Sequence, residues 1–168
     1  MSDRAGVRVA GQLLGLVVAV ALLLLSVLVA GMRWKVPPVL DAVRRMNRSV
    51  TNPRVMRTAG SAGTQTSVIR HTGRRSGRPY ETPVDIITTG DGYLIALPYG
   101  TRADWVQNVI AAGGATIVSQ GESIDVDAPI IAATAEVQGQ IPARTLRTLR
   151  LFGVGECLSL RRAADGLG

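Results

Sequence analysis

The longest hydrophobic run of the chain lies near its N-terminus. Residues 11–31 read GQLLGLVVAVALLLLSVLVAG, carry no charge, and contain only Gln12 and Ser26 as polar side chains. A helix rises about 1.5 Å per residue, so this run spans roughly 30 Å, the thickness of the hydrocarbon core of a bilayer. The pattern predicts a transmembrane helix at residues 11–32, preceded by a short flank at residues 1–10.

A cleaved signal peptide is the alternative interpretation of the same run. Arg4 and Arg8 form a positive n-region, and Leu28-Val29-Ala30 ends in a small residue. The apolar run exceeds the roughly 7 to 15 residues of a usual h-region, and Leu28 is large where cleavage needs a small side chain. A retained membrane anchor is therefore the preferred interpretation.

Positive residues are unevenly distributed on the two sides of this run. Arg4 and Arg8 precede it, whereas many more cations follow it, namely Arg33, Lys35, Arg44, Arg45, Arg48, Arg54 and Arg57. Cytoplasmic flanks of transmembrane helices carry the excess of Lys and Arg, so we expect the C-terminal domain in the cytoplasm. The prediction is a single-pass protein of the cell (inner) membrane.

A basic juxtamembrane linker is predicted at residues 33–63. Pro37-Pro38 breaks the first helix, and residues 39–48 then show apolar positions at helical spacing with arginines on the opposite side. Such a helix can lie among anionic lipid headgroups, and a solvated linker helix fits the pattern equally well. Asn52-Pro53 and the Gly-rich residues 60–63 mark the end of the linker.

Beyond residue 63 the pattern changes to short runs rich in Val, Ile, Thr and Tyr. These runs predict strands at residues 66–71, 80–88, 93–97, 115–119, 123–126, 130–138 and 156–160. Residues 89–92 (TGDG) and 120–122 (QGE) tolerate positive φ and predict antiparallel hairpins. Two helices, at residues 103–112 and 142–151, interrupt the strands. Without βαβ alternation, the pattern favours an α+β fold that is mainly β, a small barrel over residues 64–168.

Charge and composition exclude several classes of function. The formal net charge is +7, but beyond Lys35 the balance is only 15 Arg minus 11 acids, with little aromatic interleaving, so we do not expect nucleic-acid binding. Cys157 is the single cysteine and His71 the single histidine, which rules out an intrachain disulfide and a Cys or His metal cluster. No metal site is predicted, and neither a Walker loop nor a G-x-G-x-x-G motif is present.

One turn between two predicted strands concentrates chemically active groups. Residues 71–78 read HTGRRSGR and gather three guanidinium groups and several hydroxyl groups around two glycines. This composition suits an anion such as phosphate. A basic surface loop without a ligand has the same composition, so the pattern alone leaves both interpretations open.

A second segment, residues 96–108 (ALPYGTRADWVQN), predicts a strand end, a loop and the start of a helix. Thr101 with Asp104, or Asp104 with Gln107, has the spacing of a capping box. This structural interpretation leaves Asn108 unexplained, because its side-chain amide could bond to either the backbone or a ligand.

Several motifs follow one another in a fixed order between residues 66 and 137. They are Thr72-Gly73-Arg74-Arg75-Ser76-Gly77, Thr82-Pro83-Val84, a Gly-Asp-Gly hairpin, Leu97-Pro98-Tyr99-Gly100, and DWVQNVIAAG at residues 104–113. In order and spacing this region resembles the deazaflavin-dependent nitroreductase family of actinobacteria. The combination is far more specific than any single motif.

The resemblance implies a split β-barrel that binds the deazaflavin coenzyme F420. In that family the T-G-R-[KR]-S-G turn holds the phosphate of the coenzyme, the strand end borders the deazaflavin ring, and the next helix closes the site. The implied cofactor-binding residues are Arg74, Arg75, Ser76, Gly77, Arg78, Thr82, Pro83, Leu97, Pro98, Tyr99, Gly100, Asp104, Trp105 and Asn108.

Two positions depart from the family pattern. Tyr80 stands where the family often has Arg, and the loop from Gly100 to Asp104 is short. Arg78 or Arg102 is the candidate for the missing cation. Some relatives with this fold bind FMN, haem or fatty acids, so FMN is the alternative cofactor.

The implied hydride chemistry needs little from the protein beyond binding, orientation and exclusion of water. No catalytic residue is assigned, and Tyr99 is the first candidate for orienting an acceptor or donating a proton. The leading hypothesis is a membrane-anchored oxidoreductase that transfers a hydride from reduced F420 to a hydrophobic acceptor, quinone-like or a nitro compound. The alternative is a non-catalytic split-barrel protein that binds FMN, haem, F420 or a lipid. A homodimer is left open.

Three further sets of residues have simple structural interpretations. Arg144, Arg147 and Arg150 recur on one helix face, which predicts a solvated surface, with anionic lipid as the alternative partner. His71 ends a strand and is expected to serve structure, with proton transfer as the alternative. Cys157 is expected to be a buried, small apolar residue.

Overall fold

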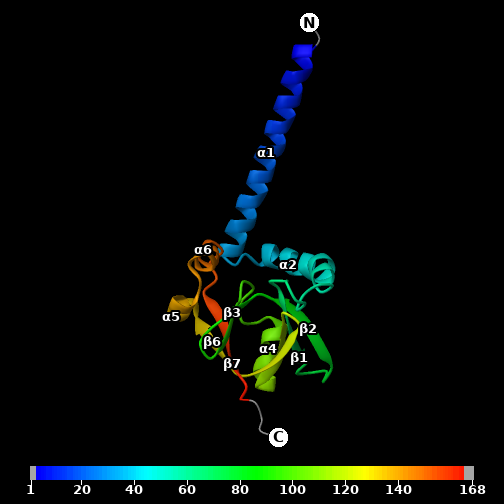
Figure 1. Cartoon of the computed structure of the whole chain (residues 1–168). Coiled ribbons are helices and arrows are strands. Elements are labelled where there is room, and N and C mark those ends of the chain that lie inside the picture. The colour runs from blue at the N-terminus through cyan, green and yellow to red at the C-terminus, as the bar shows by residue number, and fades with distance from the viewer. Residues whose placement is uncertain (1–2, 165–168) are drawn as a thin grey trace.

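A long helix, α1 (Asp3–Arg33), projects from a body of strands and short helices (Figure 1). The structure is a computed structural model that describes the backbone of residues 3–164, and side chains from residue 12 on except at residues 48 and 50. The predicted hydrophobic helix is present. Its segment Gln12–Arg33 is long and apolar enough to cross a membrane, and its most apolar stretch is not buried against any part of the chain that the structure describes.

The chain turns sharply behind α1, so that α2 (Pro37–Met46) runs across the end of that helix (Figure 1). Lys35 makes this turn with a left-handed φ of 55°. Gly31 allows it, because a Cβ at that position would lie 2.6 Å from a methyl group of Val39. The π-helical η1 (Asn47–Thr51) and the short α3 (Asn52–Val55) continue the predicted linker helix.

Seven strands form one antiparallel sheet in the order β2-β1-β5-β6-β7-β4-β3. Their bounds are β1 (Ser67–Thr72), β2 (Pro79–Val84), β3 (Ile86–Thr88), β4 (Gly92–Ala96), β5 (Gly114–Ser119), β6 (Glu122–Ala133) and β7 (Glu156–Arg162). Both predicted hairpins are confirmed. The β5–β6 turn uses Gln120 and Gly121 at positive φ, 53° and 85°.

The two edge strands of this sheet are neighbours in the sequence. Only Asp85 separates the end of β2 from the start of β3, although the two strands lie at opposite edges of the strand order. Consecutive Cα atoms lie about 3.8 Å apart, so the end of β2 and the start of β3 must lie within about two such distances of each other. The sheet therefore curls on itself, which confirms the predicted α+β barrel and splits the expected strand at residues 80–88 into β2 and β3.

One predicted strand, at residues 130–138, is wrong in its second half. Residues 122–133 form one long strand, β6, whose register shifts between Asp127 and Ile130, and residues 134–140 are helical, as α5 (Thr134–Val137) and η2 (Gln138–Gln140). The Oγ1 atom of Thr134 donates to the carbonyl of Val154 at 3.0 Å, and Glu136 accepts from the Ala133 amide at 3.3 Å. The Glu136 contact closes the start of the helical turn, and the Thr134 contact holds this turn against Val154, so the strand ends at Ala133.

Two hydrophobic cores lie on the two faces of the sheet. Inside the barrel, Val106 and Val109 of α4 (Asp104–Ala112) pack with Ile69, Ile117 and other strand residues. Outside it, Leu149 of α6 (Ala143–Leu151) packs with Leu94 and Cys157. Strand β4 contacts both cores, which explains why its run YLIA does not alternate between apolar and polar residues. Cys157 is fully buried, as predicted.

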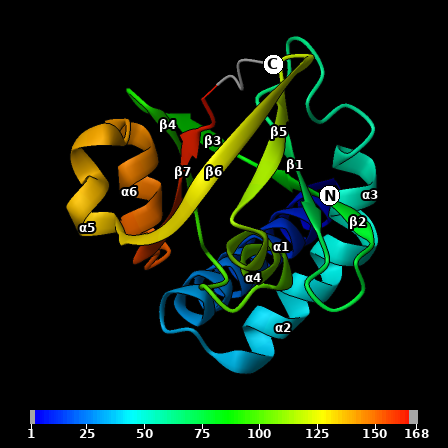
Figure 2. The same ribbon diagram turned by 90° about the horizontal axis from the view of Figure 1, so that it is seen from below.

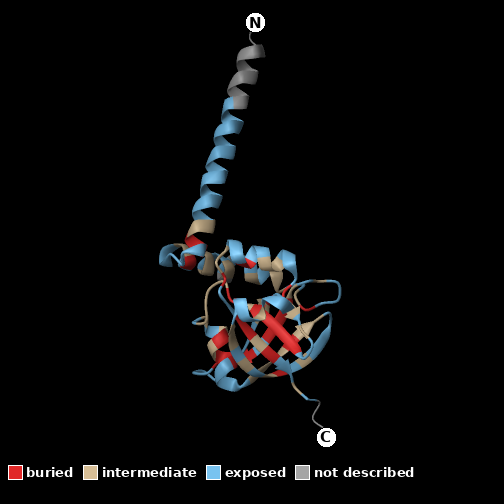
Figure 3. Cartoon of the chain, turned by 90° about the vertical axis from the view of Figure 1, so that its left-hand side faces the viewer, coloured by how far each residue is buried: buried red, intermediate tan, exposed pale blue. Residues whose placement is uncertain are grey.

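Buried positions concentrate in the sheet, while most of α1 is exposed (Figure 3). Of the described side chains of α1, those of the last turn contact the domain: Met32 is buried, and an Nη atom of Arg33 donates to the carbonyl of Arg150 at 2.6 Å. Seen from below, α5 and α6 lie on one side of the body, and α2 and α3 on the other (Figure 2). The linker helices thus reach the side of the body that carries the β1–β2 turn.

Candidate functional site

The β1–β2 turn is a compact loop of six residues, Gly73 to Arg78. The amide of Gly73 donates to the carbonyl of Arg78 at 2.8 Å, and the amide of Gly77 donates to the carbonyl of Gly73 at 2.8 Å. Gly77 has a left-handed φ of 66°, and a Cβ at Gly73 would overlap the Tyr80 ring at 2.6 Å. Gly77 is therefore favoured by its backbone conformation, and Gly73 by the closeness of the Ser76 and Tyr80 side chains, independently of any ligand.

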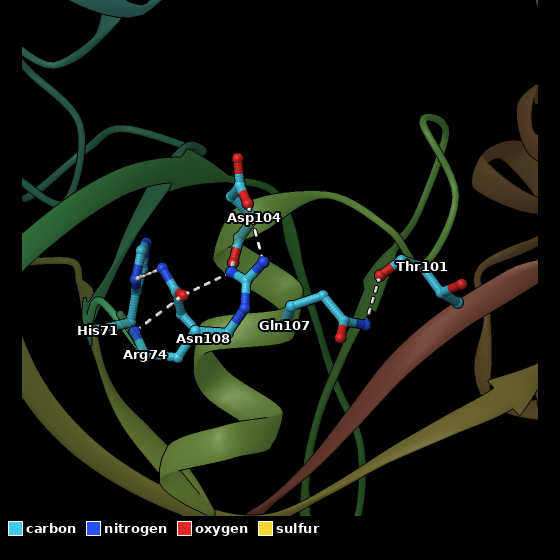
Figure 4. Close-up of polar contacts among 6 residues, drawn as sticks. All are labelled: His71, Arg74, Thr101, Asp104, Gln107 and Asn108. Carbon is cyan, nitrogen blue, oxygen red and sulfur yellow. Dashed lines mark hydrogen bonds and ion pairs between the residues drawn. The ribbon is translucent and has the colours of Figure 1, made fainter. Parts of the chain in front are cut away.

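Arg74 leaves this turn and binds to helix α4 (Figure 4). Its guanidinium donates to the side chain of Asn108 at 2.8 Å, to a carboxylate oxygen of Asp104 at 3.1 Å and to the Asp104 carbonyl at 3.3 Å. The Arg74 side chain is only 26% exposed, whereas that of Asp104 is 79% exposed. Arg74 thus ties the turn to the N-terminal end of α4.

Asn108 has a fixed orientation because both of its polar atoms are used. Its oxygen accepts from the Arg74 amide at 3.1 Å as well as from the guanidinium, so its nitrogen is the atom that donates to Nδ1 of His71 at 3.3 Å. This assignment makes Nδ1 the acceptor and places the ring hydrogen of His71 on Nε2. The residue that the sequence left unexplained is therefore the centre of the polar network.

The same logic fixes the hydrogen bonds of Thr82. Nε2 of His71 lies 3.2 Å from Oγ1 of Thr82 and must donate to it. The hydroxyl hydrogen of Thr82 is then free to donate to another group. In the register of β1 and β2, His71 lies opposite Tyr80, and the imidazole stacks on the Tyr80 ring at a centroid distance of 5.9 Å.

His71 is held neutral. Burial lowers the pKa of its imidazole below the ordinary value of 6.5, and a proton on Nδ1 would face the amide hydrogens of Asn108. Both ring nitrogens have partners inside the protein. This arrangement supports the structural interpretation of His71.

Arg75 and Arg78 differ from Arg74, although all three come from the same turn. Both are exposed, and among the described residues neither guanidinium has a hydrogen-bond or ion-pair partner. Between them, Oγ of Ser76 lies 3.2 Å from the hydroxyl of Tyr80 and accepts from the Arg78 amide at 3.3 Å. These two arginines are the cations of the turn that could bind an anion without breaking an internal contact.

The β4–α4 loop contains the second group of predicted site residues. Leu97 is buried in the barrel core, and Gly100 closes a tight turn, with a φ of 77° and an amide that donates to the Leu97 carbonyl at 3.0 Å. The hydroxyl of Tyr99 accepts from the side-chain amide of Asn47. Burial raises the pKa of the Tyr99 phenol above 10.0, partly opposed by Asn47 and by the charge of Arg44.

The predicted capping box at the start of α4 is wrong. Ala103 occupies the N-cap, and no side chain caps the helix there. Asp104 instead pairs with Arg74, and the side-chain amide of Gln107 donates to the carbonyl of Thr101 at 3.0 Å (Figure 4). Trp105 packs against the inner core. Contacts between the turn and the helix therefore replace local capping.

The predicted residues separate into two groups in space. Arg74, Asp104 and Asn108 form one network, which reaches Thr82 through His71. Tyr99 instead contacts the linker helices, through Arg44 and Asn47. This second set of contacts was not predicted from the sequence, because both linker residues fit an ordinary polar helix face.

Two surface hollows lie apart from these groups. One of about 510 Å³ is lined by residues 122–125 and 162–164, and one of about 240 Å³ by residues 88–93 and Arg162. Neither is lined by a predicted site residue. The candidate site therefore rests on its polar network and its unpaired cations rather than on either hollow.

Comparison with known proteins gives one strong match. A family model described as F420H(2)-dependent quinone reductase matches residues 43–144, which include the β1–β2 turn, the β4–α4 loop and helix α4. No curated protein matches the chain.

Similar solved structures are distant. An F420 reductase is 10% identical over 60% of this chain and 87% of that chain, with a TM-score of 0.42. An F420-H2-dependent reductase is 12% identical over 58% and 94%, with a TM-score of 0.43. The heme storage protein of Vibrio cholerae is 10% identical over 67% and 90%, also with a TM-score of 0.43. At these scores the likenesses carry no weight for function.

The stability of the protein should fall as the pH drops below 6.5. Unfolded His71 takes up a proton near its ordinary pKa of 6.5, whereas the buried imidazole resists protonation until a lower pH. The stabilisation is complete above pH 6.5 and is lost toward the folded pKa, at no more than about 1.4 kcal/mol per pH unit. Urea unfolding of the full chain in detergent at pH 7.5, 6.5 and 5.5 measures this change in the free energy of unfolding.

His71 is the only histidine, so in the variant His71→Gln the free energy of unfolding should depend less on pH between 5.5 and 7.5. Arg70→Gln, on the same strand, serves as the control and should retain the slope. Equal stability of the wild type at the three pH values would contradict the assignment of a neutral, buried imidazole.

Proposed function

The chain belongs to the F420H(2)-dependent quinone reductase family and is thus an F420-dependent oxidoreductase, and we propose that it reduces a hydrophobic acceptor while anchored in a membrane. The family match covers both groups of predicted site residues. The observation that carries the proposal is the β1–β2 turn, in which Arg75 and Arg78 are exposed and have no side-chain partner among the described residues, beside a tightly bonded network.

The donors of the turn fit the chemistry of the coenzyme. F420 carries a phosphate and an anionic tail, and supplies a hydride when reduced. Arg75 and Arg78 would bind the phosphate through charge-assisted hydrogen bonds, and Ser76 adds a hydroxyl. The free hydroxyl hydrogen of Thr82 is available to donate to a carbonyl or phosphate oxygen of the coenzyme, since its oxygen already accepts from His71.

Arg74 has a different role in this proposal from the one implied by the family resemblance. Its guanidinium is bound by Asp104 and Asn108, so phosphate binding would require it to leave two partners. We assign Arg74 to holding the turn against α4. Pro83, Leu97, Pro98, Gly100 and Trp105 would then border the ring of the coenzyme as part of the surrounding wall.

A membrane anchor supports a lipid-soluble acceptor. Helix α1 is long and apolar enough to span a bilayer, and α2 and the end of α6 lie beside its C-terminal end (Figure 1). Tethering raises the local concentration of a partner dissolved in the membrane. We therefore favour a quinone-like acceptor over a soluble one, with hydrophobic nitro compounds as the second class.

The full chain in detergent should oxidise F420H2 when a menaquinone analogue is added. The oxidised coenzyme absorbs visible light, so its appearance follows the reaction, and a nitroaromatic compound tests the second acceptor class. Tight binding of F420 without oxidation by any acceptor would favour a non-catalytic binding protein. Uptake of FMN or haem but not of F420 would contradict the cofactor.

Replacing both exposed arginines should weaken coenzyme binding. Arg75→Ala with Arg78→Ala removes charge-assisted hydrogen bonds worth about 1.5–3 kcal/mol each, so the Kd for F420 should rise at least about tenfold. Arg70→Ala, a surface arginine paired with Glu81, is the matched control. Arg74→Ala should instead mainly lower the free energy of unfolding. An unchanged Kd in the double variant would remove the turn from the site.

The domain should face the cytoplasm. Fusions of green fluorescent protein and of alkaline phosphatase to the C-terminus report opposite sides of the bacterial inner membrane, and we expect a fluorescent, membrane-bound fusion and an inactive phosphatase. Substitution of Arg33 and Lys35 by Glu should weaken this preference, because these cations flank α1 directly. An active phosphatase would contradict the proposed topology.

A further inference from the structure

The segment from Lys35 to Asn47, the first residue of η1, makes three side-chain hydrogen bonds to two consecutive residues of the β4–α4 loop. Nζ of Lys35 donates to the carbonyl of Pro98 at 3.1 Å, and an Nη atom of Arg44 donates to the carbonyl of Tyr99 at 2.9 Å. The side-chain amide of Asn47 donates to the Tyr99 hydroxyl. No predicted site residue lies in this segment, so these contacts add a new part to the site.

The linker is well placed to hold these donors. Leu40 is buried, and Val39 packs closely against Gly31 at the end of α1. Asp41 pairs with Arg44 at 3.2 Å, one turn before Asn47. Helix α2 is therefore held by apolar packing near its start, where it meets α1, and by hydrogen bonds to the β4–α4 loop near its end.

The direction of the hydrogen bond at Tyr99 determines where the phenolic proton points. A phenol has one O–H hydrogen and an oxygen that can accept. Because the Asn47 nitrogen donates to this oxygen, the hydrogen of Tyr99 is not used in that contact and is free to donate to another group. Burial raises the pKa of the phenol, so the proton is retained at neutral pH even with the cations Lys35 and Arg44 nearby.

We propose that Asn47, on the juxtamembrane helix, is a positioning residue that orients the Tyr99 hydroxyl toward the acceptor, so that the membrane-side linker completes the barrel site. The inference rests on the proposed function. It also implies that the acceptor binds beside the linker, on the side of the domain from which α1 projects (Figure 1).

The proton and electron balance gives Tyr99 a defined step. A quinone-class acceptor is reduced to a hydroquinone by two electrons and two hydrogens. The hydride from reduced F420 brings both electrons and one hydrogen, and the proton from Oη of Tyr99 completes the second hydroxyl group. Tyr99 would then regain a proton from solvent, while the coenzyme, having given up its hydride, would release one proton to solvent, so that the sum is F420H2 plus quinone to F420 plus hydroquinone.

Asn47→Asp is the decisive variant, because it conserves size but reverses the hydrogen bond. The introduced carboxylate can only accept, so the Tyr99 proton turns toward it and away from the acceptor. We expect kcat with a menaquinone analogue to fall at least about tenfold, while the KM for F420H2 stays within about twofold. Asn47→Leu, which removes the donor at similar volume, should also lower kcat. Arg45→Gln, at an exposed position of α2, is the matched control.

A second measurement does not depend on turnover. In the full chain without coenzyme, labelled with ¹³C at Cζ of tyrosine, the Tyr99 signal is identified by its loss in Tyr99→Phe. Asn47 lowers the Tyr99 pKa in the wild type, so both Asn47 variants should titrate at a higher pH than the wild type. In the Tyr99→Phe background, Asn47→Asp should have no further effect on kcat.

The outcomes separate this inference from the proposed function. A wild type that does not oxidise F420H2 with any acceptor refutes the proposed function. A wild type that turns over, with Asn47→Asp equally active or with Tyr99→Phe equally active, refutes only the role of Asn47. A merely structural contact would tolerate Asn47→Asp, because the hydrogen bond is conserved and only its direction changes.

Discussion

The candidate site depends on the hydrogen bonds of one buried amide, that of Asn108. This side chain joins two regions that are far apart in the sequence: Asn108 is carried by α4, accepts twice from Arg74 in the β1–β2 turn, and donates to His71 at the end of β1. A buried amide left without partners costs about 1–3 kcal/mol. The positions of the turn, the strand and the helix relative to one another therefore depend on the same hydrogen bonds.

Closure of the sheet places this network beside the loop that carries Tyr99. Strands β2 and β3 lie at opposite edges of the sheet, yet Asp85 alone links them, so the sheet must curl. Helix α4 fills the concave side of the barrel through Val106 and Val109 and connects the Tyr99 loop to the β1–β2 turn. The barrel thus supplies a rigid frame, and the chemistry is left to its loops and to the linker.

The sequence predicted the elements better than it predicted their contacts. The hairpins, the barrel and α1 were predicted correctly, because they depend on local patterns. These patterns are alternating apolar residues, glycine-containing turns and the apolar N-terminal segment. The helix at residues 134–140 was missed, since Thr134 is fixed by Val154, twenty residues away. The binding of Arg74 to α4 also depends on a distant partner, so composition could not distinguish it from the unpaired Arg75.

The linker shows most clearly why the site could not be completed from the sequence. Lys35, Arg44 and Asn47 fit a membrane-proximal polar helix, and only the tertiary structure brings them to Pro98 and Tyr99. These residues therefore connect the position of α1 to the orientation of the Tyr99 side chain. No sequence pattern relates these two features. Helix α1 packs against α2 at Gly31 and Val39, and α2 leads directly to Asn47 and its hydrogen bond to Tyr99. The long apolar helix is therefore joined to the loop of the proposed site by side-chain contacts as well as by the course of the chain.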